Sequence, residues 1–370
     1  MMRAAPGKYA TACTFGRVAS RAVVSTCLML AIVPLSAQLF SEDHTGKYDT
    51  TYIRVYRDEL TTRMFLSRRQ NGYFLPERLF SPWIRYKTND QLLFGVGYTY
   101  SFLTLNLSLK LPFLNGDDEQ YGESRILDLQ THTIFRNMIV DLYLQWNRGF
   151  YLADPPDPLG SPGSGNGYPV RGDLRTTLVG INIQRLFNSE RYSYKASFVQ
   201  NEIQKRSAGS PLLGVEAYWM LGMADSLIIP GYLQQREFAH GGDFNQADLF
   251  NLGLNGGYAY TLVIRRRFYI SLSTVIGLAA GSCVLNYTAT SDLNRSGLTW
   301  GINNHNRVSM GYNKNDFYIG VSWVQFNMGN TCGYRKGWFR YSSGNIRINV
   351  VRRFRLHRSI KVLRPDLWVF

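Results

Sequence analysis

Three polar side chains with the chemistry of an acid–base or metal site stand at every second position of one short stretch. Asp128, Gln130 and His132 alternate with Leu127 and Leu129, and alternate residues of a β-strand share one face. A carboxylate beside an imidazole can act as a general base or bind a metal ion. However, no second histidine follows at ligand spacing. We therefore interpret these residues as a polar ladder, and we expect no catalytic residue, metal site or cofactor.

A lipid hydrolase at the rim of a barrel is the enzymatic alternative. Outer-membrane acyl hydrolases use a serine and a histidine with a third polar residue, and the candidates here are Ser207 or Ser210 with His132. The expected topology places these serines and the histidine at opposite ends, which disfavours an enzyme. The glycine-rich stretches add no chemistry. GVG (95–97) lacks the third glycine of a dinucleotide fingerprint, and GSPGSGNG (160–167) lacks the Gly-Lys-Ser/Thr end of a phosphate loop.

The segments that must position these side chains have the period of a strand. In LTLNLSLKL (103–111) a leucine occupies every second position, with polar residues between. Similar segments recur with about 9–14 residues each, the length with which a tilted strand crosses a bilayer. Short polar turns alternate with long loops rich in Pro, Gly and Asn. The pattern predicts an all-β fold, an antiparallel transmembrane β-barrel of about 12–14 strands with short periplasmic turns and long extracellular loops.

A soluble β-sandwich would also alternate. The polar faces are rich in Gly, Ser, Asn, Thr and Gln, which favours a wet lumen, and aromatic residues gather beside the short turns, where an interfacial girdle is expected. YSYKASFVQN (192–201) is predicted to be one of the strands, and QKRSAGSP (204–211) one of the long outer loops. The residues expected to line the lumen are Asp128, Gln130, His132, Asp141, Gln145, Asn182, Gln184, Lys195 and Asn251.

The two ends of the chain indicate export to the outer membrane. A basic start, an apolar run and a small-residue cleavage site are typical of a cleaved signal peptide, here 1–37. We expect a periplasmic lead-in at 38–60, the barrel at 61–354, and a periplasmic tail or final strand at 355–370. The chain ends in LWVF. Outer-membrane barrels usually end on an aromatic residue that the barrel-assembly machinery reads, so this machinery is an expected partner.

The charge of the chain suits anionic partners. Lys and Arg number 41 against 26 Asp and Glu, a formal net charge of +15. Outer-membrane lipid and lipopolysaccharide are the expected partners, and export argues against nucleic acid. We expect Lys205, Arg206, Lys336 and Arg340, in or beside the predicted long loops, to contact lipopolysaccharide phosphates. Solvated loop charge without a partner is the alternative.

Two of the four cysteines precede the predicted cleavage site, which leaves Cys283 and Cys332 in the exported chain. Both fall at long loops on the presumed outer side. Because an exported pair can be oxidised, the sequence suggests one disulfide, with two free thiols as the alternative.

Several blocks of the sequence resemble a known family. They include YDTTYIRVYRDELTTRMFLSRR (48–69), LLFGVGYTYSFLTLNLSLKL (92–111) and FNSERYSYKASFVQNEIQKRSAGSPLLG (187–214). These blocks are similar to an uncharacterised outer-membrane β-barrel family, a domain-of-unknown-function family of Bacteroidetes-type Gram-negative bacteria. The resemblance implies the fold and the location but no activity, so it supplies no catalytic residue.

Three functions follow as hypotheses. The first is a small pore with a polar lumen, which a barrel of this size can accommodate. The second is a plugged barrel whose basic outer loops contact lipopolysaccharide, glycan or a partner protein. The third, the least favoured, is the rim lipid hydrolase.

Overall fold

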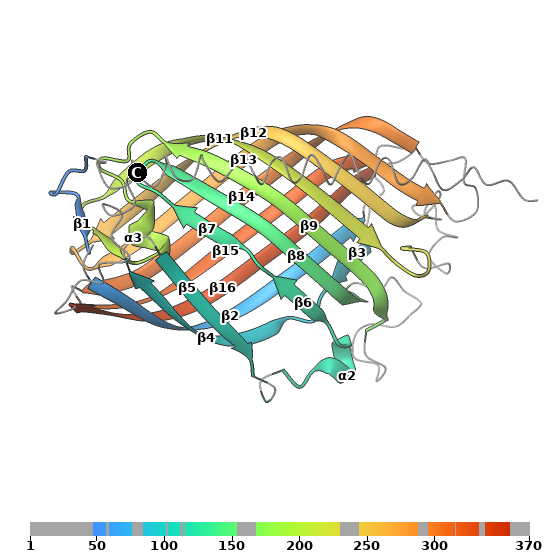
Figure 1. The fold of residues 1–370 in the computed structure, drawn as a ribbon, viewed down its shortest axis with the longest axis horizontal. Helices are drawn as coiled ribbons and strands as arrows, with labels where there is room; N and C mark the ends of the chain where they lie inside the picture. Colours follow the sequence, from blue (N-terminus) through green and yellow to red (C-terminus); the bar gives the residue numbers. More distant parts are fainter. Residues whose placement is uncertain are drawn as a thin grey trace, which may run out of the picture. The chain divides into compact units, whose positions relative to one another are not determined.

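Long antiparallel strands make up most of the chain that the computed structural model describes (Figure 1). In that part of the chain, no helix is both long and apolar enough to cross a membrane. The main sheet contains β2 (Glu59–Leu75), β3 (Ile84–Lys87), β4 (Gln91–Tyr100), β5 (Leu103–Lys110), β6 (Arg125–Asp128), β7 (Thr131–Ile134), β8 (Met138–Leu152), β9 (Val170–Leu186), β11 (Ala208–Met223), β12 (Phe244–Ile264), β13 (Phe268–Tyr287), β14 (Arg295–Lys314), β15 (Phe317–Cys332) and β16 (Gly337–Arg355). A second sheet pairs β1 (Ile53–Val55) with β10 (Glu202–Gln204), and the helices are α2 (Asp118–Tyr121) and α3 (Tyr194–Phe198). The described residues are 47–56, 59–75, 84–100, 103–111, 113, 115–153, 168–229, 244–287, 295–314, 316–332 and 337–355, all within one compact unit.

Ten strands of the main sheet close into a barrel. Neighbours around the ring follow the order β2, β16, β15, β14, β13, β12, β11, β9, β8 and β3, and β3 returns to β2. The closing pair runs from Arg340 opposite Phe74 to Arg355 opposite Glu59. With β4 to β7 the sheet has fourteen strands among the described residues. The predicted all-β antiparallel barrel is confirmed. The sequence predicts about 12–14 strands in it, whereas the closed ring has ten of the fourteen strands of this sheet.

Side chains alternate between the outer face and the lumen, as the strand period requires. In β13, Leu272 and Leu278 are exposed on the outer face, whereas Ser273 and Val275 between them are buried inside. The same alternation recurs around the ring. The barrel therefore presents apolar side chains outward and keeps its polar side chains in the lumen.

Buried side chains fill both halves of the lumen. Toward the long loops, Tyr73, Phe150, Leu174, Phe326 and Phe339 belong to one apolar cluster. Toward the short turns, a second cluster brings inward residues of β9, β11, β12 and β13 together with Tyr192 and Tyr194 beside α3. The lumen is thus packed above and below its middle.

The predicted strand at 192–201 is wrong, because this segment forms α3 and packs inside the barrel. Ser193 caps the helix by accepting a hydrogen bond from the backbone N–H of Ala196, and the Tyr194 hydroxyl donates to Ser273 Oγ at 3.1 Å. Alternating aromatic and polar residues imitate a strand here, yet the rings are buried in the lumen. As a result, 204–211 is not an outer loop: it carries the end of β10 and the start of β11 at the short-turn end.

The predicted signal peptide (1–37) lies outside the described residues, as does the C-terminal segment after Arg355, with its aromatic end. Of the predicted lead-in, 53–55 form β1, and 59–60 already belong to β2.

Candidate ligand-binding site at a split in the barrel wall

The barrel wall divides between β3 and β8. Toward the long loops these strands pair directly, with Tyr86 opposite Leu152 and Lys87 opposite Tyr151. Beyond that point β4 continues along β2 and carries β5 at its edge, whereas β6 and β7 pair with β8. Among the described residues, the outer edge of β5 pairs with no strand, and neither do the outer edges of β6 and β7. We call the gap between these two edges the wall split.

Irregular backbone on both sides marks where the wall split begins. β3 and β4 are separated by residues 88–90, and β8 has a bulge at Gly149, whose φ of +85° favours glycine. Ser124 links the two sides, because its hydroxyl accepts from the backbone N–H of Asn89 and donates to the Gly149 carbonyl, both at 2.8 Å. Buried hydrogen bonds therefore fix the closed end of the split.

The leucine-rich stretch of the sequence forms the free border of the split. Leu107 and Leu109 pair with Val96 and Phe94 on the outer face of the β4–β5 hairpin, as the alternation predicts. Asn106 lies on the opposite face, across from Gly97. The border is therefore apolar outside and polar toward the lumen.

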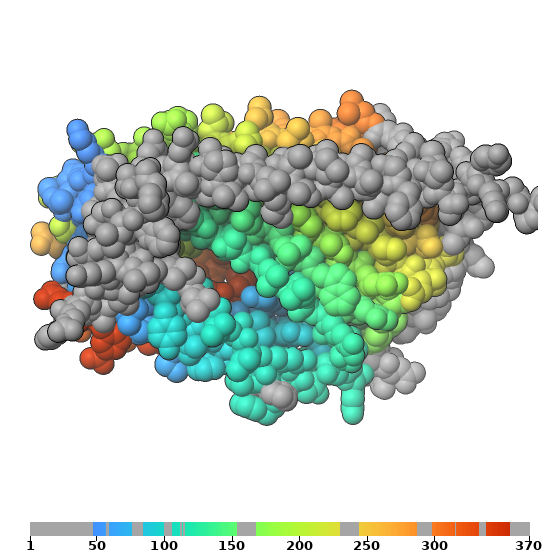
Figure 2. All heavy atoms as spheres, in the orientation of Figure 1, coloured from blue at the N-terminus to red at the C-terminus, as the bar shows by residue number. Residues whose placement is uncertain are grey.

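A cavity of about 210 Å³ lies behind the wall split. Its lining comes from both borders, through Asn106 of β5 and Thr131 and His132 of β7, and from the far wall, through β15 and β16. Figure 2 shows the hollow between the cyan and green parts of the surface, with blue and dark red atoms visible inside. The cavity thus opens sideways through the wall.

Arginines on two neighbouring strands give the cavity its charge. Arg63 and Arg69 point inward from β2, and Arg347 points inward from β16, opposite Ser67. Arg63 donates to two neutral acceptors, Thr99 Oγ1 at 2.7 Å and the carbonyl of Val199 at 2.8 Å. The Arg347 guanidinium stacks 4.3 Å from the centre of the Phe65 ring. The Nε atoms of all three arginines are buried and find no hydrogen-bond partner among the described residues.

Within the described residues, an ion pair crosses the cavity from one side of the split to the other. Arg69 Nη1 lies 3.1 Å from Asp128 Oδ2, and these side chains come from β2 and β6. A fourth lining arginine, Arg307, is neutralised by Asp141 at 2.6 Å, and Asp141 also bonds His132 Nδ1 at 2.8 Å. Positive charge therefore exceeds negative charge around Arg63 and Arg347.

A polar network crosses the middle of the lumen behind the cavity. Glu216 accepts from Asn303 at 2.7 Å and from Asn255 at 2.8 Å, and Asn255 also donates to Asn182 at 2.9 Å. His305 contacts Glu216 at 3.4 Å and the Tyr218 hydroxyl at 3.0 Å. Most of these groups bond one another, although Asn255 Oδ1 finds no partner among the described residues. The network lies between the two apolar clusters.

Two of the residues predicted to line the lumen do not lie on strands: Lys195 is in α3, and Gln130 lies between β6 and β7. Gln130 and the residues on strands make contacts inside the barrel or are buried there: Asp128, Gln130, His132, Asp141, Gln145, Asn182, Gln184 and Asn251.

The sequence predicts that four basic residues lie together in or beside the long outer loops. This placement is wrong, because the structure separates them. Lys205 and Arg206 lie at the short-turn end, where Lys205 Nζ donates to the Thr50 carbonyl at 2.5 Å and Arg206 stacks on Tyr52. Arg340 is in β16 near the long loops, stacked on Phe74, and Lys336 lies outside the described residues. The error follows from the segment 192–201, since a crossing strand there would have reversed the position of 204–211.

The serines of the hydrolase hypothesis form hydrogen bonds elsewhere. Ser207 Oγ accepts from the backbone of Val263, and Ser210 Oγ donates to the Pro211 carbonyl. His132 instead contacts Asp141. Within the described residues, no group of three or more His, Cys, Asp or Glu side chains could hold a metal ion.

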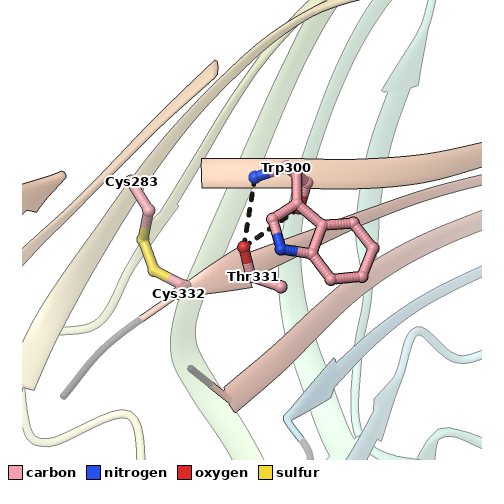
Figure 3. The surroundings of a disulfide bond; sticks show 4 residues. All are labelled: Cys283, Trp300, Thr331 and Cys332. Atoms are coloured by element: carbon pink, nitrogen blue, oxygen red, sulfur yellow. Dashed lines mark hydrogen bonds between the residues drawn. A yellow bond between two sulfur atoms is a disulfide. The ribbon is translucent and has the colours of Figure 1, made fainter. Parts of the chain in front are cut away.

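Cys283 of β13 and Cys332 of β15 form a disulfide (Figure 3), with Cα atoms 5.6 Å apart. Beside it, Thr331 Oγ1 accepts from the backbone N–H of Trp300 at 3.2 Å and donates to the Trp300 carbonyl at 3.0 Å. These contacts join β14 to β15 above the last paired residues of the two strands, Asn303 and Met328.

No curated protein matches this chain. Three solved barrels are similar in fold: the outer-membrane protease OmpT from Escherichia coli (7% identity, 81% of this chain and 98% of that chain, TM-score 0.32), the translocator domain of autotransporter NalP from Neisseria meningitidis (9%, 89% and 98%, 0.31) and the Pseudomonas putida toluene transporter TodX (7%, 81% and 91%, 0.28). A family model described as a domain of unknown function, DUF4421, matches residues 47–354, and the chain therefore belongs to the DUF4421 family.

Proposed function

We propose that this protein is an integral outer-membrane β-barrel, closed along its axis, that binds a small oxyanion in the cavity behind the wall split. The apolar outer face supports a membrane location. Exposed aromatic residues beside the short turns, such as Tyr258, Tyr260, Phe268 and Phe317, support an interfacial position for that end. By the usual asymmetry of such barrels, the short turns face the periplasm.

A closed axis is supported by the packing of the lumen. Two apolar clusters and the network around Glu216 occupy successive levels of the barrel. An open axial pore, the first hypothesis from the sequence, requires a continuous polar path through these levels. We therefore favour the plugged barrel, the second hypothesis. The binding site that we propose lies in the wall of the barrel and not at its outer loops.

The observation that carries the proposal is the excess of positive charge around the cavity. Arg63, Arg69 and Arg347 line it, and within the described residues neither Arg63 nor Arg347 forms an ion pair with a carboxylate. Charged groups inside a protein are usually paired. Guanidinium groups match carboxylate and phosphate in geometry, so an oxyanion in the cavity would balance this charge.

Titration of inorganic phosphate or acetate into the purified, detergent-solubilised barrel tests the proposal by calorimetry. Arg347→Gln should weaken phosphate binding about tenfold to a hundredfold, because hydrogen bonds to charged groups contribute about 1.5–3 kcal/mol. Arg352→Gln is the matched control, since this arginine is exposed on the outer face of the same strand, stacked on Phe354. Equal affinities in the two variants, or no binding by the unmodified barrel, would refute the proposed site.

A further inference from the structure

We infer that the bound oxyanion is the head of a single-chain amphiphile, a fatty-acid carboxylate or an alkyl phosphate, which enters sideways from the membrane through the wall split. This inference rests on the proposed function, because the head occupies the arginine-lined cavity. It adds the class of ligand and the route by which the ligand arrives.

The first support is the level of the split within the apolar outer face. On the β5 border, Leu107 is 59% and Leu109 73% exposed. On the opposite border, Leu127 is 51% and Leu129 56% exposed. Side chains of this kind on the outside of a barrel face hydrocarbon. The split therefore opens where the acyl chains of lipids lie, and a ligand already in the bilayer reaches it directly.

The second support is the polarity of the borders themselves. The edges of β5, β6 and β7 that face the split carry backbone N–H and C=O groups with no strand partner among the described residues. Such groups are costly in hydrocarbon and are tolerated at membrane depth where they line a hydrated cavity. The split is thus a polar passage in an apolar wall. A charged head can pass along it while the tail remains against the leucines outside.

The third support is the order of side chains from the mouth inward. Asn106 and Thr131 stand at the borders with Asp128, whose carboxylate is paired with Arg69. The other arginines stand behind them on β2 and β16. Both ends of the lumen are packed, by the cluster around Tyr73 and by the cluster with Tyr194. A ligand therefore meets fewer obstacles at the side of the barrel than along its axis.

Photolabelling in a bilayer tests the inference. The full barrel is placed in phosphatidylcholine nanodiscs with a dodecanoate that carries a diazirine near its carboxylate, and labelled peptides are quantified by mass spectrometry. Peptides with residues 103–110 and 125–134 should be labelled at least fivefold more than the peptide with 268–287, whose outer face is equally apolar. The excess should disappear in Arg347→Gln and persist in Arg352→Gln. Unlabelled dodecanoate and dodecyl phosphate, added separately as competitors, show whether the site prefers a carboxylate or a phosphate head.

Blocking the opening of the wall split gives an independent experiment. Asn106→Trp should abolish the excess labelling, whereas Ser108→Trp should preserve it, because Ser108 lies on the same face of β5 but does not line the cavity. Even labelling around the unmodified barrel would overturn the amphiphile inference, and the proposed oxyanion site would stand if phosphate still bound. If the unmodified barrel does not bind phosphate, the proposed function itself is refuted.

Discussion

Removing the carboxylate that spans the wall split should strengthen anion binding. Asp128 is the acidic partner of Arg69, at 3.1 Å, and both side chains are largely shielded from solvent, with 7% and 21% exposed. In Asp128→Asn the Arg69 guanidinium gains a free edge, and a negative charge that repels an incoming anion is lost. The variant should therefore bind phosphate more tightly than the unmodified barrel does.

The size of the effect follows from the geometry of this ion pair. An anion on the far edge of the Arg69 guanidinium would lie roughly 8 Å from the Asp128 carboxylate. At an effective dielectric constant of about 20, two unit charges at that distance repel by about 2 kcal/mol. This energy corresponds to about thirtyfold in affinity, and screening by water in the cavity reduces it to roughly tenfold.

Calorimetric titration with phosphate at low ionic strength measures the change directly. Asp90→Asn is the matched control, because Asp90 pairs with Arg68 at 3.2 Å, and that arginine is exposed on the outer side of β2. The control should leave the phosphate affinity unchanged. Unchanged or weaker phosphate binding in a folded Asp128→Asn barrel would refute the electrostatic reasoning, since the cavity would then not be where the anion binds.

Three further predictions concern the barrel as a whole. In planar bilayers the refolded protein should give no steady conductance steps, and replacement of 192–201 by a short Gly-Ser turn should produce them; steps from the unmodified protein would contradict a closed axis. Cys283→Ser should lower the free energy of unfolding by up to about 4 kcal/mol, because the disulfide spans 49 residues, and urea titration of oxidised and reduced protein measures this. Leu272→Arg on the outer face should lower the free energy of unfolding by about 2–4 kcal/mol if the residue lies near the bilayer midplane. The same change in a soluble barrel would be nearly neutral. The heat-dependent shift of the folded band on gels distinguishes the two results.

Local periodicity was enough to predict the barrel and the direction of most side chains. Asp141, Gln145 and Asn182 alternate with apolar residues along β8 and β9 and point into the lumen. The same periodicity failed at α3, where Tyr192 and Tyr194 alternate with polar residues but are buried inside the barrel. Two-residue alternation distinguishes the faces of a strand, and it cannot distinguish a strand from a short plug whose rings happen to alternate.

The cationic cavity could not be predicted from any one stretch of sequence. Arg63 and Arg69 stand near the start of the barrel and Arg347 near its end, and they become neighbours only because β2 pairs with β16. Their inward direction could have been predicted from the alternation alone, as could that of His305 and Arg307 in β14. Their proximity, and the absence of an ion pair at two of them within the described residues, depend on barrel closure.

The position of the wall split has a local cause that connects the fold to the proposed site. Asn and Asp are depleted in strands, and Asn89 and Asp90 interrupt the path from β3 to β4. At the same level β8 bulges at Gly149, and Ser124 ties the two irregularities together. Had either strand been regular, β4 could have continued beside β8 and closed the wall along its full length. The irregular backbone that weakens this part of the sheet is therefore what opens the arginine-lined cavity toward the outer face of the barrel. The Ser124→Ala variant should therefore change the rate at which the diazirine-bearing dodecanoate labels the barrel, to a slower or a faster value. The dissociation constant for phosphate should stay unchanged.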